Sequence, residues 1–520
     1  MEVLSKIEVT FDHEVVNKAL QNIDQAVELI SDGRRLGVMK VGLPVPKEYV
    51  HLARLPAMPA SSLGCSIFKN KYQTAFAYKT GAMANAIASA ELVIAMGKRG
   101  LLASYGAGGV NAEQVEQDVL TIKSALGHQP FAVNLIHAPH EQLLEQKCVD
   151  ICLKHQVRII EASAFMNMTA SILHYRLAGV HLNEQGQVVS DNSVVAKVSR
   201  PEVALQFMEP APDNLVKKLL AEGKISSEQA MLAPYLPVAD DITVEADSGG
   251  HTDRRPLISL LPVIQRLKAK VEKEHNYAAR IRIGAAGGIG TPEAALAAFS
   301  LGADYIVTGS INQSCQESGS SDIVREALAQ AEISDVEMAP AADMFEMGVQ
   351  LQVLKRGTLF PMRSKKLYKI YQSYDSLDAI PPEVKMQLEQ QIFKKSLEAV
   401  WEETCTFFAK RDPAQVERAA ADPKRKMALV FRSYLGLSSF WANQGLVERK
   451  LDYQIWTGPS MGAFNDWVKG SYLEVAKNRN VADVAQHIMR GCAFLQRLQW
   501  LKSLGVEVPH HFQQYQIVES

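Results

Sequence analysis

Residues 280–310 read RIRIGAAGGIGTPEAALAAFSLGADYIVTGS, and this stretch decides the fold. Arg280–Gly284 alternates polar and apolar side chains as a buried strand does, and glycines then remove the side chains from the following turn. Pro292 begins a helix, Asp304–Thr308 forms the next strand, and Gly309 with Ser310 ends it. Two successive strand ends therefore carry glycine loops whose backbone N–H groups suit a dianion, although tight turns in any α/β protein have the same pattern.

The middle three-fifths of the chain repeats a strand followed by a helix. Helical patterns such as Asn111–Leu126, Glu141–His155 and Pro292–Leu301 separate the strands. This alternation predicts a parallel sheet covered by helices, and a count of about eight strands favours a closed (β/α)8 barrel, the TIM barrel, over an open sheet. In such barrels phosphate binds after strands seven and eight, where the two glycine loops stand. The candidate strands are Tyr78–Gly81, Leu101–Tyr105, Phe131–Ile136, Val157–Ala162, Val194–Val198, Ile242–Ala246, Arg280–Gly284 and Tyr305–Thr308.

Shifts in composition divide the chain into three parts. Between residues 200 and 240 an insertion reads as short helices separated by prolines, and after about Gln330 the alternation of strands and helices stops. All five tryptophans lie beyond that point. We therefore predict an N-terminal extension (1–75), a barrel (76–335, with a helical insertion at 200–240) and a helical C-terminal domain (336–520).

Composition excludes several classes of protein. The 520 residues are 47% hydrophobic and 22% charged with a formal net charge of −2, which fits a globular protein and argues against a general nucleic-acid binder. The N-terminus lacks the basic and apolar regions of a signal peptide, and no apolar run is long enough to span a membrane. The six cysteines show neither a disulfide framework nor the spacing of a zinc site. We therefore expect a cytoplasmic protein with no membrane span and no bound metal.

The motif VEADSGGHTD at the end of the sixth strand carries a candidate acid. His251 follows Gly249 and Gly250, so the backbone can approach a flat ligand while the imidazole projects over it. Histidine suits proton donation near neutral pH, and Glu245 or Asp247 would orient it or carry its counter-charge. The structural alternative is a loop histidine held by a neighbouring carboxylate.

A third group of residues surrounds the first strand. Small side chains crowd Gly81–Gly109, GAMANAIASAELVIAMGKRGLLASYGAGG, which leaves room either for a ring the size of isoalloxazine or for a close helix–strand contact. Asn134 carries an amide that matches the pyrimidine edge of a flavin. Lys197, ending the fifth strand, would stabilise negative charge on such a ring or form a buried ion pair.

With these motifs, residues 81–315 resemble the flavin-dependent superfamily of nitronate monooxygenases and enoyl-acyl-carrier-protein reductases. Within it, the chain is similar nearly end to end to the trans-acting enoyl reductases of bacterial polyunsaturated fatty acid synthases and of polyketide synthases. The motifs that carry this resemblance are GAMANAIAS, VNLIH, EASAFM, AKVSRPEVA, EADSGGHTD, GAAGGIGTP, TGSINQ, APAADMFEMGVQLQVLKRGTLFP and DYQIWTGPSMGAFNDWVKGS.

The resemblance implies FMN as the bound cofactor, NADPH or NADH as the reductant, and His251 over the reactive face. Smaller reductases of the superfamily place Glu-Ala directly before Gly-Gly-His, whereas Asp247 and Ser248 intervene here. The carboxylate role is therefore open between Glu245 and Asp247. The residues implied to contact the cofactor are Met83, Ala84, Asn134, Lys197, Gly249, Gly250, Gly287, Gly288, Ile289, Gly309 and Ser310.

The implied function is reduction of the α,β-double bond of intermediates bound to acyl carrier protein, in the biosynthesis of polyunsaturated fatty acids or polyketides. Hydride would pass from the nicotinamide through FMN to the enoyl thioester. Because no strand-borne GxGxxG motif with a ribose-binding acid is found, we predict one shared site and ping-pong kinetics. The resemblance also implies a homodimer that stands alone, without a fused acyltransferase. The alternatives are a nitronate monooxygenase-type flavin oxidase and a flavin-bearing scaffold of the synthase.

Two basic clusters follow the barrel. One contains Arg363, Lys365 and Lys366, and the other is Lys424–Lys426. Acidic carrier proteins would dock on such clusters by charge attraction, whereas an ordinary solvated face is the alternative interpretation. The tryptophans and the DYQIW and GAFNDW segments are expected to build helical core or a wall of an acyl tunnel.

Overall fold

The computed structural model describes residues 9–137 and 142–519 and contains a closed barrel of parallel strands. The strands follow one another around the barrel in chain order, and β15 pairs with β5 to close it. The TIM barrel and all of its predicted strands are thereby confirmed. The barrel strands are β5 (Tyr78–Thr80), β6 (Leu102–Tyr105), β7 (Ala132–Ile136), β8 (Ile159–Ser163), β11 (Ser193–Val198), β12 (Asp241–Glu245), β14 (Arg282–Ala286) and β15 (Tyr305–Thr308).

The seventh barrel strand begins at Arg282 rather than at the predicted Arg280. Arg280 is half exposed and forms an ion pair with Asp304. Arg282 is buried, and its Nε and Nη2 each lie 2.6 Å from the carboxylate of Asp241, which opens the neighbouring strand β12. The alternation of polar and apolar residues in the sequence therefore begins two residues before the strand. Arg280 forms its ion pair near the surface, whereas Arg282 forms its ion pair inside the barrel.

Helices follow the strands and cover the barrel, and side chains cap several of them. Ser89, Asn111, Thr169 and Thr291 accept hydrogen bonds from the first turns of α3, α4, α6 and α11, which stabilises each helix by about 1 kcal/mol. Residues 200–240, predicted as an insertion, contain three short helices, and the hairpin before β11 was not predicted. Glu141, the predicted start of α5, lies outside the described residues. The elements are α2 (Ser66–Tyr72), α3 (Ala90–Lys98), α4 (Ala112–Leu126), α5 (Gln142–Lys154), α6 (Ala170–Ala178), β9 (Val180–Leu182), β10 (Val188–Ser190), α7 (Pro201–Met208), α8 (Asp213–Ala221), α9 (Ser227–Leu232), α10 (Leu257–His275), α11 (Pro292–Ser300) and α12 (Asp322–Ala329).

The chain beyond the barrel is mostly helical, but it also contributes two strands that the sequence analysis missed. β16 (Val336–Pro340) pairs with β17 (Gln350–Leu354), and β17 also pairs with β13 (Gly250–His251) in the loop after the sixth barrel strand. The alternation QLQV at the start of β17 was a local indication of this strand. The helices of this region are α13 (Phe360–Ser373), α14 (Pro382–Leu388), α15 (Leu397–Arg411), α16 (Pro413–Ala421), α17 (Pro423–Gln444), α18 (Ser460–Trp467) and α19 (Val481–Ser503).

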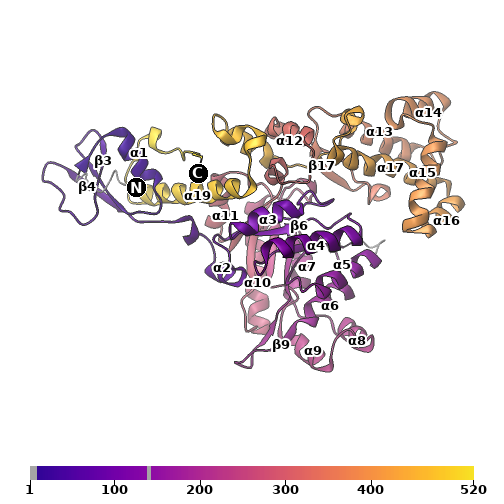
Figure 1. Cartoon of the computed structure of the whole chain (residues 1–520), viewed down its shortest axis with the longest axis horizontal. Coiled ribbons are helices and arrows are strands. Elements are labelled where there is room, and N and C mark those ends of the chain that lie inside the picture. Colours follow the sequence, from indigo (N-terminus) through magenta and orange to yellow (C-terminus); the bar gives the residue numbers. More distant parts are fainter. Residues whose placement is uncertain (1–8, 138–141, 520) are drawn as a thin grey trace.

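A small subdomain precedes the barrel. It contains α1 (His13–Gln21) and an antiparallel sheet of order β1-β3-β2-β4. Figure 1 shows this subdomain at one end of the molecule and α14–α16 at the other, with the barrel between them. None of the helices in residues 9–137 and 142–519 has both the length and the apolar character needed to cross a bilayer. The strands are β1 (Val9–Thr10), β2 (Val27–Ser31), β3 (Leu36–Met39) and β4 (Val50–Leu55).

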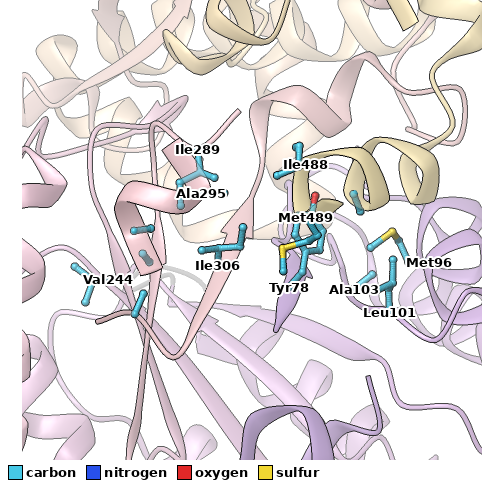
Figure 2. Close-up of a cluster of buried hydrophobic side chains, with 14 of the residues drawn as sticks. Tyr78, Met96, Leu101, Ala103, Val244, Ile289, Ala295, Ile306, Ile488 and Met489 are labelled. Carbon is cyan, nitrogen blue, oxygen red and sulfur yellow. The ribbon is translucent and has the colours of Figure 1, made fainter. Parts of the chain in front are cut away.

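Helix α19 joins the subdomain to the barrel. Ile488 and Met489 are fully buried and belong to the same apolar cluster as Tyr78 of β5 and Met96 of α3 (Figure 2). Farther along the helix, Arg497 is 1% exposed and donates to the backbone carbonyls of residues 20, 22 and 25 at 3.3, 2.8 and 3.3 Å. Burial lowers the pKa of Arg497 to about 10, so the guanidinium remains charged at neutral pH.

We expect Arg497→Ala to loosen the subdomain, because three backbone carbonyls lose a charged donor. The free energy of unfolding in urea should fall by about 2–3 kcal/mol, and proteolysis of residues 9–55 should become faster. Arg490→Ala is the matched control, since Arg490 lies on the same helix and contacts Asp24 of the same subdomain at 3.1 Å, but near the surface. Such a surface pair contributes about 0–1 kcal/mol, so equal losses in the two variants would contradict this account.

Candidate active site

Strained backbone gathers where the barrel strands end. Asn85 and Ala86 after β5, Ala164 after β8 and Arg254 after β12 have φ angles of 58°, 54°, 61° and 53°. Each such conformation in a non-glycine residue costs about 1–3 kcal/mol and is found mostly at functional sites. The other described non-glycine residues with positive φ lie at or just after the ends of helical segments, where this conformation is common: Gln73, Gln156, Asn276 and Lys394.

The glycine loops after β14 and β15 lie at this same face, the barrel mouth. Gly287 and Gly288 have φ of 82° and 75°, which favours glycine at both positions. In the described part of the chain, the N–H groups of Gly288, Ile289, Gly309 and Ser310 donate to no protein acceptor. A Cβ atom added to Gly288 or Gly309 would meet no atom within 4 Å. Free donors beside open space on adjacent loops fit a phosphate group.

A segment from far along the chain lies against these loops. It is Thr457–Ser460, within which the N–H of Gly458 donates to Ser310 Oγ at 3.0 Å. A Cβ on Gly290 would lie 2.5 Å from the carbonyl oxygen of its last residue, and a Cβ on Gly249 would lie 2.7 Å from the Cα of its first residue. Backbone therefore approaches backbone at both positions, which only glycine permits.

His251 lies at the same rim in β13, where pairing with β17 fixes its backbone. Its side chain is 46% exposed, and its Nε2 lies 3.1 Å from Oδ1 of Asp343. Burial alone would lower the pKa of His251, but the hydrogen bond and the charge of Asp343 outweigh burial and raise it above the usual value. Asp343 lies in the loop between β16 and β17, and the sequence analysis did not assign it a role.

Glu245 and Asp247, the two predicted carboxylates, bind other groups. Oε1 of Glu245 lies 3.0 Å from Nζ of Lys197. Oδ1 of Asp247 accepts a hydrogen bond from Nε2 of Gln352 at 3.2 Å, which holds the His251 loop on β17. Glu245 still acts on His251 through space, since its charge helps to raise the pKa of the imidazole. Asp343 is therefore a third candidate for the carboxylate role.

Charged side chains fill the barrel beneath this mouth. Glu161 is 1% exposed, forms an ion pair with Lys79 and accepts a hydrogen bond from the N–H of Ala82 at 3.2 Å. Burial raises the pKa of Glu161, but Lys79 and Lys197 lower it by more, so the carboxylate stays charged. Burial also lowers the pKa of Lys197, but Glu245 and Glu161 raise it above the usual value. Ion pairing thus keeps Lys197 a cation.

The remaining predicted residues also lie in barrel strands or in the loops that follow them. Nδ2 of Asn134 donates to Ser163 Oγ at 2.8 Å and to the carbonyl of Glu161 at 3.0 Å, which fixes the amide within β7. Met83 and Ala84 are half-buried in the turn after β5, where the N–H of Ala88 donates to the Met83 carbonyl at 3.1 Å. The structure therefore gathers all the predicted contact residues toward one end of the barrel.

A cavity of about 480 Å³ opens at the opposite end of the barrel, beside Cys65, Arg280 and Asp304. Neither His251 nor the two glycine loops line it. Because the catalytic residues of TIM barrels come from the C-terminal ends of the strands, we assign the candidate site to the mouth and not to this cavity.

Comparison with known proteins identifies the family. The sequence family described as nitronate monooxygenase matches residues 68–369, which is more than half of the chain. The chain belongs to the nitronate monooxygenase family. Residues 374–453 also match a family described as the inserted helical domain of acyl-carrier-protein S-malonyltransferase.

Several known proteins are similar to this chain over the barrel and well beyond it. The enoyl reductase domain of MlnA from the macrolactin cluster of Bacillus amyloliquefaciens is 40% identical over 86% of this chain and 99% of that domain, with a TM-score of 0.81. Polyketide biosynthesis protein PksE of Bacillus subtilis is 45% identical over 84% of this chain, and a polyunsaturated fatty acid synthase polypeptide of Thraustochytrium sp. is 50% identical over 85%. These matches confirm the predicted resemblance. The chain spans 57% of the length of PksE and 30% of that of the Thraustochytrium polypeptide.

The basic side chains of the two clusters have partners within the chain, and their role in docking stays a prediction. Arg363 forms an ion pair with the buried Asp452. Nζ of Lys424 donates to the backbone carbonyls of Tyr371 and Tyr374. Long basic side chains can reach such buried groups, which a run of charges in a sequence does not reveal. The other partners are Glu337 for Lys365, Gln387 for Lys366, Gln415 for Arg425 and the ring of Trp401 for Lys426.

We expect Glu161→Gln to destabilise the barrel, because it leaves Lys79 buried without its counter-charge. Removing one partner of a buried ion pair costs about 3–5 kcal/mol, measurable as a lower free energy of unfolding in urea. Glu116→Gln is the matched control, since Glu116 pairs with Lys154 at 2.7 Å on the surface of α4, where a pair contributes about 0–1 kcal/mol. A loss no larger than that of the control would show that the interior pair does not stabilise the barrel.

Proposed function

We propose that this chain is an enoyl reductase acting in trans on a polyunsaturated fatty acid or polyketide synthase. It would reduce the α,β-double bond of intermediates bound to acyl carrier protein. The observation that carries this proposal is the 40% identity with an enoyl reductase domain along 99% of that domain. The names of PksE and of the polyunsaturated fatty acid synthase polypeptide support the pathway.

FMN is the cofactor that we propose. The free N–H groups of the two glycine loops would bind its phosphate. Asn134 would contact the pyrimidine edge of its ring, and Lys197 would stabilise negative charge there. When bound, FMN supplies hydride transfer between a reduced nicotinamide and the β-carbon of an enoyl thioester. Because the sequence contains no second dinucleotide motif, NADPH or NADH and the thioester would occupy the same mouth in turn.

His251 is the proposed donor of the proton that the α-carbon receives. Its Nε2 is occupied by Asp343, whereas Nδ1 has no hydrogen-bond partner among the described residues. Asp343 favours the charged imidazolium, so Nδ1–H is available as an acid near neutral pH. Asp343 would not touch the substrate. It acts through His251 and is therefore a positioning residue.

A nitronate monooxygenase-type oxidase is the second candidate, favoured by the family that matches residues 68–369. Such an enzyme would oxidise alkyl nitronates with oxygen and would need no nicotinamide. The probable nitronate monooxygenase of Staphylococcus haemolyticus is 24% identical and matches only 48% of this chain. The synthase relatives match 84–86% of it, which supports the reductase.

Anaerobic mixing of flavin-loaded protein with NADPH, followed by a crotonyl thioester, separates these functions. A reductase should lose its visible flavin absorbance with NADPH and regain it with the thioester. The control without thioester should stay colourless. No loss of colour with NADPH, combined with oxygen uptake on an alkyl nitronate, would favour the oxidase. Flavin-loaded protein that neither loses its colour with NADPH nor takes up oxygen with a nitronate would leave the flavin-bearing scaffold.

His251→Ala should lower turnover of the enoyl thioester by about 10²–10⁴-fold, the usual contribution of a general acid. FMN binding should be unchanged, because the phosphate cradle lies on other loops. His181→Ala is the matched control, since this histidine of the β9–β10 hairpin is 47% exposed, close to the 46% of His251. Wild-type turnover in His251→Ala would refute the assignment.

Asp343→Asn should change the pH profile of kcat/KM. The proposed active form of His251 is the imidazolium, so kcat/KM falls as pH rises through the pKa of His251. Asp343 raises that pKa, and its removal lowers it; the descending limb should therefore move to lower pH. Asp247→Asn is the control, because Asp247 binds Gln352 rather than His251, and its limb should stay in place. An unmoved limb in Asp343→Asn would exclude the positioning role.

A further inference from the structure

We propose that Ser460, at the start of α18, together with the Ser310 hydroxyl oriented by Gly458, binds the phosphate of FMN. The phosphate site would then have a third wall contributed from beyond the barrel. This inference rests on the proposed use of FMN. Gly458 lies 148 residues after Ser310 and outside residues 68–369, the part of the chain that matches the nitronate monooxygenase family.

The first step concerns the hydroxyl of Ser310. A serine hydroxyl has one donor hydrogen and two acceptor lone pairs. The Gly458 N–H occupies an acceptor position at 3.0 Å, and within the described residues Ser310 Oγ donates to no protein group. The hydroxyl hydrogen is therefore free for a ligand. It stands next to Gly309, where an added Cβ would meet only open space.

The second step concerns Ser460 itself. The residue is 8% exposed, its hydroxyl remains accessible to solvent, and that hydroxyl has no hydrogen-bond partner in the part of the chain that the structure describes. Its carbonyl oxygen would lie 2.5 Å from a Cβ on Gly290, so the residue stands against the loop after β14. A free hydroxyl that stands beside the unoccupied N–H groups of this loop can donate a hydrogen bond to a ligand, and the FMN phosphate is the ligand that we infer.

The third step concerns the charge of the ligand. The groups that meet here are donors: the free N–H groups of the two loops and the hydroxyls of Ser310 and Ser460. The first turn of α18 carries no acidic residue, and Pro459 before it provides no capping side chain. Glu245 and Asp247 are occupied by Lys197 and Gln352. A set of donors without a competing carboxylate suits a dianion such as the FMN phosphate, and not the neutral end of the flavin.

The test compares FMN with riboflavin, which lacks the phosphate. Titration of the flavin-free full chain, followed by flavin fluorescence, gives the Kd of each ligand. Ser460→Ala should weaken FMN binding about ten- to hundredfold, as expected for loss of a hydrogen bond to a charged group, with riboflavin binding changed less than about twofold. Ser310→Ala should behave in the same way. Ser364→Ala, which removes another buried hydroxyl that donates to Pro361, is the matched control and should change neither Kd.

A second measurement needs no substitution. Hydrogen exchange at residues 456–467 of the wild-type chain should be slowed by FMN and much less by riboflavin. Equal weakening of both ligands in Ser460→Ala, unchanged FMN binding in that variant, or equal protection by both ligands would overturn the inference and leave the proposed function standing. Wild-type protein that binds neither flavin would instead refute the cofactor of the proposed function, and this inference with it.

Discussion

The barrel mouth depends on contacts between backbone atoms that leave no room for a side chain. A Cβ on Gly287 would lie 2.6 Å from the carbonyl carbon of Ala246, and those on Gly249 and Gly290 would be as close to the segment Thr457–Ser460. Real Cβ atoms do not approach other atoms so closely, so the loops after β12 and β14 and the distant segment can form one layer only because these positions are glycine. In that layer, free N–H groups and the His251 loop share one rim.

The charges beneath the rim are arranged so that each has an opposite neighbour. Buried ions lose their hydration, and this cost is offset only where partners are close and further hydrogen bonds are made. These ion pairs therefore keep Lys197 a cation and Glu161 an anion even when no ligand is bound. In the proposed function, phosphate would therefore be bound by backbone and hydroxyl donors, and Lys197 would face the flavin ring. The alternating series is Lys79, Glu161, Lys197, Glu245, His251 and Asp343.

The sequence was sufficient for the barrel but not for the whole mouth. Most barrel strands are short, largely apolar runs followed by a turn and a helix, and this pattern is local. The contact of His251 with Asp343 joins residues 92 apart, and that of Ser310 with Gly458 joins residues 148 apart, so neither has a local pattern. Glu245 and Asp247 were chosen because they are neighbours of His251 in sequence, whereas the fold brings a third carboxylate to the imidazole.

The chain leaves the barrel mouth after β17, forms helices α13–α17, and returns to the mouth at almost the same point. At the end of β17 the N–H of Leu354 donates to the carbonyl of Ile455 at 2.9 Å, and Val353 forms a bridge with Trp456. Residues 374–453, the matched helical domain, lie between these ends. One end of this insertion continues the strand that pairs with His251, and the other leads into the segment Thr457–Ser460, which lies against the glycine loops. Both ends of this insertion are therefore fixed at the rim, beside the loop that carries His251.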